Sequence, residues 1–110
     1  MSISDRYRAL SDDVSRFVAA QKKKFGESED PTLKDALKAL RKGDEVLLEL
    51  KESVGEIPRI RLEDQLTPVL LKGHNNLDRG RLQFLEAGEE AVAAEVWTLQ
   101  QAIYRLLNDL

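Results

Sequence analysis

The sequence predicts an all-α protein, an antiparallel bundle of three to four main helices with heptad-like packing. Two observations carry this prediction. Long segments place apolar residues at alternating spacings of three and four, which is the period of one face of an α-helix. Strand signals are nearly absent, because only residues 57–62 alternate briefly and that stretch contains a proline. Helical rods joined by short turns pack most simply as antiparallel neighbours.

The first helix is expected over about residues 3–25. Ser2, with Asp5 three residues later, is typical of a capping box. Three lysines at 22–24 suit the negative end of the helix dipole, and Gly26 lies where a C-terminal cap belongs. The apolar stripe of this segment consists of Ile3, Tyr7, Leu10, Val14 and Phe17.

The second helix is expected over about residues 31–54. Asp30 is a good N-cap, Pro31 suits the first helical position, and Gly55 can end the helix. Gly43 falls on the same line as the apolar residues, which are Leu33, Leu37, Leu40, Leu47, Leu50 and Val54.

The third helix is expected over about residues 68–87. A proline inside a helix removes a hydrogen bond and kinks the chain, so Pro68 is expected at the first helical position with Thr67 as its N-cap. A separate short helical turn is expected near residues 61–66. Gly88 then closes the third helix.

The stretch Leu70 to Leu85 allows two structures. Gly73 and Gly80 fall on the line of buried residues, seven apart, which favours a continuous or locally kinked helix. Such glycines would let a neighbouring backbone approach closely, with a large residue such as Trp97 filling the notch. The alternative is a break after Gly73, with Asn75 or Asn76 capping a new helix.

The fourth helix is expected over about residues 89–109. Its stripe consists of Val92, Val96, Leu99, Ile103, Leu106 and Leu110. Trp97 and Tyr104, seven residues apart, form a second apolar strip beside it. These two aromatics either fill the core of the domain or anchor a protein partner, because such residues are enriched at interface anchors.

Composition limits the classes of protein that this chain can belong to. Its 110 residues are 42% hydrophobic and 34% charged, with a net charge of −3, which fits one globular domain over residues 1–110. Leu110 is expected to be either the native end or the boundary of an N-terminal domain in a longer protein. The chain has no cysteine, so thiol and disulfide chemistry are excluded and a cytoplasmic location is expected.

The sequence offers little material for catalysis. His74 is the only histidine, and Leu71 three residues before it does not fit the Glu-x-x-His pattern of di-iron bundles. No phosphate-binding glycine loop and no serine in a nucleophile elbow is present. We therefore expect no catalytic residues, no cofactor, no metal and no enzymatic activity.

Positive charge is concentrated in residues 57–84, which carry five cations and three acids. On a continuous helix, Lys72 and Arg79 share a face with two amide side chains. The candidates for contact with a phosphate backbone are Lys72, Arg79 and Arg81. The alternative is an ordinary solvated face whose cations pair with the acidic fourth helix.

The expected function is a non-catalytic helical interaction module that self-associates or docks a protein helix through its amphipathic faces, with Trp97 and Tyr104 as the candidate interface. Its partner would be a protein or a second copy, and no membrane is involved. The alternative is a small helical subunit of a nucleoprotein assembly that contacts phosphates through the basic face of residues 72–83.

Overall fold

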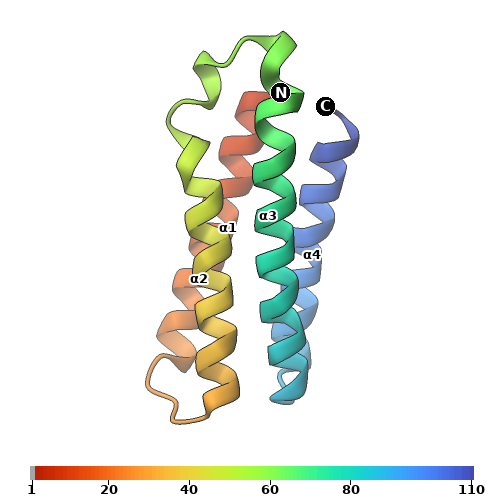
Figure 1. Cartoon of the computed structure of the whole chain (residues 1–110). Coiled ribbons are helices and arrows are strands. Elements are labelled where there is room, and N and C mark those ends of the chain that lie inside the picture. Colours follow the sequence, from red (N-terminus) through yellow and green to blue (C-terminus); the bar gives the residue numbers. More distant parts are fainter. Residues whose placement is uncertain (1) are drawn as a thin grey trace.

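The computed structural model describes residues 2–110 and confirms the all-α bundle. The α-helices of this part of the chain are α1 (Ile3–Phe25), α2 (Pro31–Lys51), α3 (Arg59–Glu86) and α4 (Glu90–Asn108), with a short 3-10 helix, η1 (Val54–Glu56), before α3. They run alternately down and up, so both chain ends lie at one end of the bundle (Figure 1). The bundle measures 46 × 22 × 20 Å. No helix within residues 2–110 has the length and apolar character needed to cross a membrane.

The predicted starts of the first two helices are confirmed by their caps. The Ser2 side chain accepts a hydrogen bond from the Asp5 backbone N–H at 3.0 Å. At α2, the Asp30 carboxylate accepts from the Thr32 N–H at 2.9 Å, and Pro31 is the first helical residue. Each cap satisfies one of the backbone donors that a helix start leaves without an intrahelical partner.

The second helix ends earlier than predicted, at Lys51 rather than residue 54. The chain tightens into η1, where the Ile57 N–H bonds the Val54 carbonyl at 3.2 Å. Ile57 is extended because the α conformation is disfavoured for a residue that precedes proline. The tighter turn keeps Val54 fully buried while it redirects the chain towards α3.

The predicted start of the third helix is wrong. Helix α3 begins at Arg59 and runs through Pro68 without interruption, so there is no separate turn at 61–66. A proline inside a helix costs about 3 kcal/mol, whereas burying a leucine contributes roughly 1.5–3 kcal/mol. Leu62 and Leu66 are both buried on the N-terminal side of Pro68, so together they offset that cost. Pro68 itself is exposed, which places the lost hydrogen bond on the side that water can reach.

The stretch from Leu70 to Leu85 is one continuous helix, so the break at Gly73 does not occur. The Asn76 side chain bonds the Lys72 carbonyl inside the helix at 3.0 Å instead of capping a new one. The end of α3 is a Schellman-type turn: the Glu89 N–H bonds the Phe84 carbonyl and the Gly88 N–H bonds the Leu85 carbonyl. Gly88 takes a φ of +80°, which glycine adopts without strain.

Helices α2 and α3 interlock through leucines that lie over glycines. A Cβ placed on Gly80 would lie 2.9 Å from Leu40 Cδ2, and one on Gly73 would lie 3.0 Å from Leu47 Cδ2. The third contact is reversed, because a Cβ on Gly43 of α2 would lie 3.1 Å from Leu77 Cδ2 of α3. The close approach predicted for the two α3 glycines is therefore present, but leucines of α2 fill the notches and Trp97 does not.

Helix α1 is joined to α2 by a buried tyrosine. The Tyr7 side chain is fully buried, and its hydroxyl donates to the Leu47 carbonyl at 2.5 Å. Burial, reinforced by the nearby Glu49 carboxylate, raises the pKa of the Tyr7 hydroxyl, so it stays protonated. This hydrogen bond fixes α1 on the same leucine that lies over Gly73.

The interlock predicts that the effect of Gly80→Ala on the free energy of unfolding changes sign when Leu40 is removed. In the native background, Gly80→Ala should lower the free energy of unfolding by about 1 kcal/mol, because overpacking against Leu40 outweighs the gain in helix propensity. In a Leu40→Ala background the clash is gone, so the same substitution should stabilise by up to about 1 kcal/mol. Urea unfolding followed by circular dichroism measures all four proteins. The same sign in both backgrounds would contradict the interlock.

Candidate functional site

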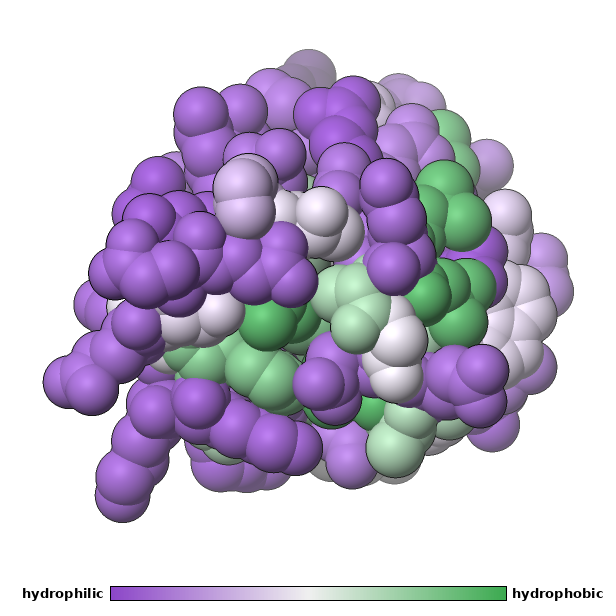
Figure 2. Space-filling model, turned by 90° about the horizontal axis from the view of Figure 1, so that it is seen from below, coloured by the Kyte–Doolittle hydropathy of each residue, from purple (hydrophilic) through white to green (hydrophobic). Residues whose placement is uncertain are grey.

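The exposed apolar residues gather on one side of the bundle. Within residues 2–110, seven large hydrophobic side chains are at least 40% exposed. Two of them lie apart from the others: Leu48 of α2 and Ile60 at the start of α3. We call the other five the α3/α4 face, and they are Leu71, Leu82, Leu85, Trp97 and Tyr104. Figure 2 looks along the bundle from the end with the α3–α4 turn and shows green hydrophobic atoms reaching the surface on the right, the side of α4 in Figure 1.

The two helices present these residues towards the same seam. On α3, Leu71 and Leu82 are eleven residues apart, which is three helical turns, and Leu85 follows at a spacing of three. On α4, Trp97 and Tyr104 are seven apart, which is two turns. A shallow hollow spans the seam and is lined by Arg81, Leu85, Glu90, Ala93, Ala94 and Trp97.

The α4 side of the face is poor in charge. Between residues 91 and 104 the exposed positions are Ala91, Ala94, Glu95, Trp97, Thr98, Gln101 and Tyr104. Only Glu95 among them is charged, in a chain that is 34% charged as a whole. Depletion of charge around aromatic residues is the compositional mark of an interface core.

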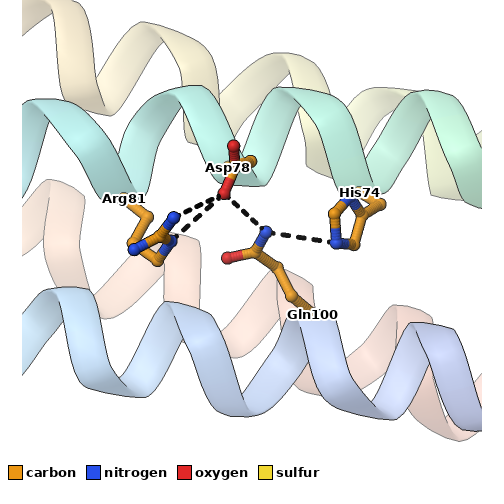
Figure 3. Close-up of polar contacts among 4 residues, drawn as sticks. All are labelled: His74, Asp78, Arg81 and Gln100. Carbon is orange, nitrogen blue, oxygen red and sulfur yellow. Dashed lines mark hydrogen bonds and ion pairs between the residues drawn. The ribbon is translucent and has the colours of Figure 1, made fainter.

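A partly buried polar network lies beneath the face (Figure 3). Gln100 of α4 is fully buried, and its Nε2 lies 3.0 Å from Asp78 Oδ1 and 3.3 Å from His74 Nε2. The guanidinium of Arg81 bonds the same Asp78 oxygen through Nε at 3.1 Å and Nη2 at 2.9 Å. Three residues of α3 and one of α4 are therefore joined across the seam.

Both aromatic residues of the face touch this network. The Arg81 guanidinium lies over the Trp97 ring, 5.4 Å from its centroid, in cation–π geometry. The rings of His74 and Tyr104 meet edge to face with centroids 4.5 Å apart. The network thus supports Trp97 and Tyr104 from below while leaving each of them nearly half exposed.

The chemistry of the side chains sets the direction of the hydrogen bond between Gln100 and Asp78. A carboxylate can only accept hydrogen bonds, so Gln100 presents its NH₂ group to Asp78. The same NH₂ group lies 3.3 Å from His74 Nε2, where it can donate to the tautomer of His74 that carries its proton on Nδ1. The hydrogen bond from Gln100, followed by the hydrogen bonds and charge of Arg81, lowers the pKa of Asp78 below its ordinary value. The Gln100 Oε1 atom is buried without a hydrogen-bond partner in the described chain.

His74 is buried, and its Nε2 faces Gln100 at the seam between α3 and α4. No group of three or more histidine, aspartate or glutamate residues in positions 2–110 is arranged to bind a metal ion.

The structure separates the three candidate phosphate contacts. Lys72 and Arg79 are exposed on one side of α3, two turns apart, and neither forms an ion pair within 4.0 Å in the described part of the chain. Arg81 is turned instead towards α4, where it is held between Asp78 and Trp97. The predicted pairing of these cations with the acidic fourth helix is absent for Arg81, whose ionic partner lies on its own helix.

Sequence reasoning missed the three leucines of the face and the network beneath it. Leu71, Leu82 and Leu85 lie beside the buried line of α3, and their helical spacing was an available signal. Gln100 lies between Val96 and Ile103 on the buried stripe of α4, where an amide needs a polar partner. That partner is Asp78, and nothing in the sequence alone pairs the two.

Removing the charge of Asp78 should change the acid stability of the protein. Because the pKa of Asp78 is lowered from 3.8 on folding, its contribution is present above about pH 4 and is lost as the pH falls through the folded-state pKa. Asp78→Asn should cost about 1 kcal/mol at neutral pH and flatten the loss of stability below pH 4. Urea unfolding between pH 2 and 7 measures this (roughly the range of carboxylate titration). The control is Glu95→Gln, at an exposed site of α4, which should show the same loss of stability below pH 4 as the native protein.

Comparison of the chain with protein-family models, with curated proteins and with solved structures finds no match.

Proposed function

We propose that this protein is a non-catalytic helical interaction module that binds a protein helix or a second copy through the α3/α4 face. The observation that carries the proposal is the gathering of five half-exposed apolar side chains on a surface whose α4 side is poor in charge. The proposal keeps the cytoplasmic location and the protein partner expected from the sequence, and it assigns no cofactor and no catalytic residue.

The supported aromatics favour this proposal in energetic terms. Immobilising a flexible side chain at an interface costs about 0.5–1.5 kcal/mol, and that cost falls when the side chain is already held in its bound conformation. Arg81 and His74 contact Trp97 and Tyr104 in the free chain. Tryptophan and tyrosine are also the residues that most often dominate binding energy at protein interfaces.

A charge placed in the α3/α4 face should prevent docking without unfolding the bundle. Leu82 is 52% exposed, so Leu82→Glu adds a solvated carboxylate and should leave the circular dichroism spectrum and unfolding midpoint nearly unchanged. In quantitative pull-downs from the native source, the substitution should remove proteins, or untagged copies of the chain, that the native bait retains. The matched control is Leu48→Glu, which places the same charge at a 40% exposed leucine of α2. Equal capture by all three baits would contradict docking through this face.

The second candidate function, a helical subunit of a nucleoprotein assembly, is favoured by one observation. Lys72 and Arg79 are exposed two turns apart on α3 and form no ion pair in the described chain. That spacing is about 10 Å along the helix axis, so the two cations can contact phosphates on one strand.

If nucleic acid is the partner, each phosphate-contacting cation contributes to the salt dependence of binding. Lys72→Ala and Arg79→Ala should each reduce the slope of log binding constant against log salt by about one. Arg81→Ala should leave that slope nearly unchanged, because Asp78 already neutralises Arg81. Filter binding of single-stranded and duplex oligonucleotides between 50 and 200 mM salt measures these slopes. Absence of binding at the lowest salt would exclude this function.

A further inference from the structure

We propose that the α3/α4 face is a homodimer interface on which a second copy docks with its helices antiparallel to the first. The two copies are related by a two-fold axis that lies in the plane of the interface, perpendicular to the helices, at the level of Asp78 and Gln100. This inference rests on the proposed function and commits it to one occupant, a second copy of this chain.

Four of the five apolar residues of the face are distributed evenly about that level, and the fifth, Leu82, lies four residues after Asp78. Leu71 and Leu85 lie seven residues before and after Asp78, while Trp97 and Tyr104 lie three before and four after Gln100. The 3.0 Å contact between Asp78 and Gln100 shows that these two centres have the same height in the bundle. The two-fold rotation therefore places Leu71 over Leu85 of the second copy and Trp97 over its Tyr104.

The charges around the face are opposite at its two ends. On α3, the exposed Lys72 adjoins Leu71 at one end, and the exposed Glu86 adjoins Leu85 at the other. On α4, Arg105 borders a hollow with Trp97, Gln101, Tyr104 and Asn108, and Glu90 borders the hollow at the opposite end of the seam. The same rotation brings Lys72 towards Glu86 of the second copy and Arg105 towards its Glu90.

Charge complementarity decides the orientation. A parallel pair would place α3 of one copy over α4 of the other, which brings Lys72 near Arg105 and Glu86 near Glu90, and like charges brought together disfavour association. In the antiparallel pair each ionic contact forms twice, because a two-fold interface is self-complementary. None of Lys72, Glu86, Glu90 and Arg105 has an ion-pair partner within 4.0 Å in residues 2–110, so all four are available to a second copy.

The size of the face sets the strength of the dimer. From Leu71 to Leu85 it is about 21 Å long, and it is two helices wide at about 10 Å each. Two such faces bury on the order of 800 Å² in total, below the roughly 1,200–2,000 Å² of stable interfaces. Arg79 lies near the axis and approaches its own copy, which weakens the pair further. The dimer is therefore weak, and it forms over a micromolar to millimolar range of protein concentration.

Sedimentation velocity from about 10 μM to 1 mM tests this inference over the range in which such a face associates. The native chain should shift from monomer to dimer across the series. Lys72→Glu and Glu86→Lys should each raise the dissociation constant at least about fivefold, because each replaces two symmetry-related attractions by repulsions. The double swap Lys72→Glu/Glu86→Lys should restore it, and Leu48→Glu should leave it unchanged. In a parallel dimer each single swap would instead turn a repulsion from Arg105 or Glu90 into an attraction and lower the dissociation constant, so that result would overturn the proposed orientation.

A zero-length carbodiimide cross-link adds a direct measure of the geometry. Lys72 and Glu86 are about 21 Å apart along one helix, so an amide between them must join two chains. Peptide mass spectrometry should find this link in native protein at high concentration and lose it in Leu82→Glu. A native chain that stays monomeric at 1 mM and lacks the link overturns the dimer. A different result would contradict the proposed function itself: capture of the same proteins by the Leu82→Glu, Leu48→Glu and native baits.

Discussion

The register between α2 and α3 is the constraint on which the rest of the bundle depends. Each of the three glycine notches accepts one leucine of the facing helix: Leu40 at Gly80, Leu47 at Gly73 and Leu77 at Gly43. Moving either helix by one residue rotates its contact surface by about 100°, which brings leucine against leucine at a spacing that has no room for both. The helices therefore meet in one register, and the rotation of α3 about its own axis is fixed with it.

Because the rotation of α3 is fixed, the directions in which its remaining side chains point are fixed as well. The sector next to the glycines directs His74, Asp78 and Arg81 towards α4, where Gln100 completes the network. Leu71 and Leu82 are turned to solvent beyond that seam. A polar layer of this kind tolerates few alternative arrangements, since any shift of α4 along α3 leaves buried donors and acceptors unpaired. The exposed aromatics are consequently attached to the best-defined part of the structure.

Local sequence signals determined most of the fold and little of the site. Caps at Ser2 and Asp30 and the stripes of α1 and α4 are properties of short segments, so their bounds were predictable. The predicted start of α3 at Pro68 was wrong because local preference favours a helix start there. The burial of Leu62 and Leu66, which extends the helix back to Arg59, depends on tertiary packing. Gly73 and Gly80 were placed correctly on the buried line, but the leucines that fill them, Leu47 and Leu40, lie 26 and 40 residues earlier in the chain. The Asp78–Gln100 pairing requires the height of α4 relative to α3, which no periodicity within one helix supplies.

Pro68 has a consequence for how the bundle opens. A helix is cooperative because each residue after the first turn adds a hydrogen bond to an existing one, and proline omits one of these bonds. The segment from Arg59 to Thr67 is also joined to the chain by the exposed Pro58 turn, whereas the segment after Pro68 carries the glycine interlock. The first two turns of α3 therefore form a separate unit of local unfolding, with a lower opening free energy than the remainder of the same helix. Helix α3 is therefore continuous in geometry but consists of two segments with different opening free energies. The α3/α4 seam belongs to the segment after Pro68, which is the more stable one.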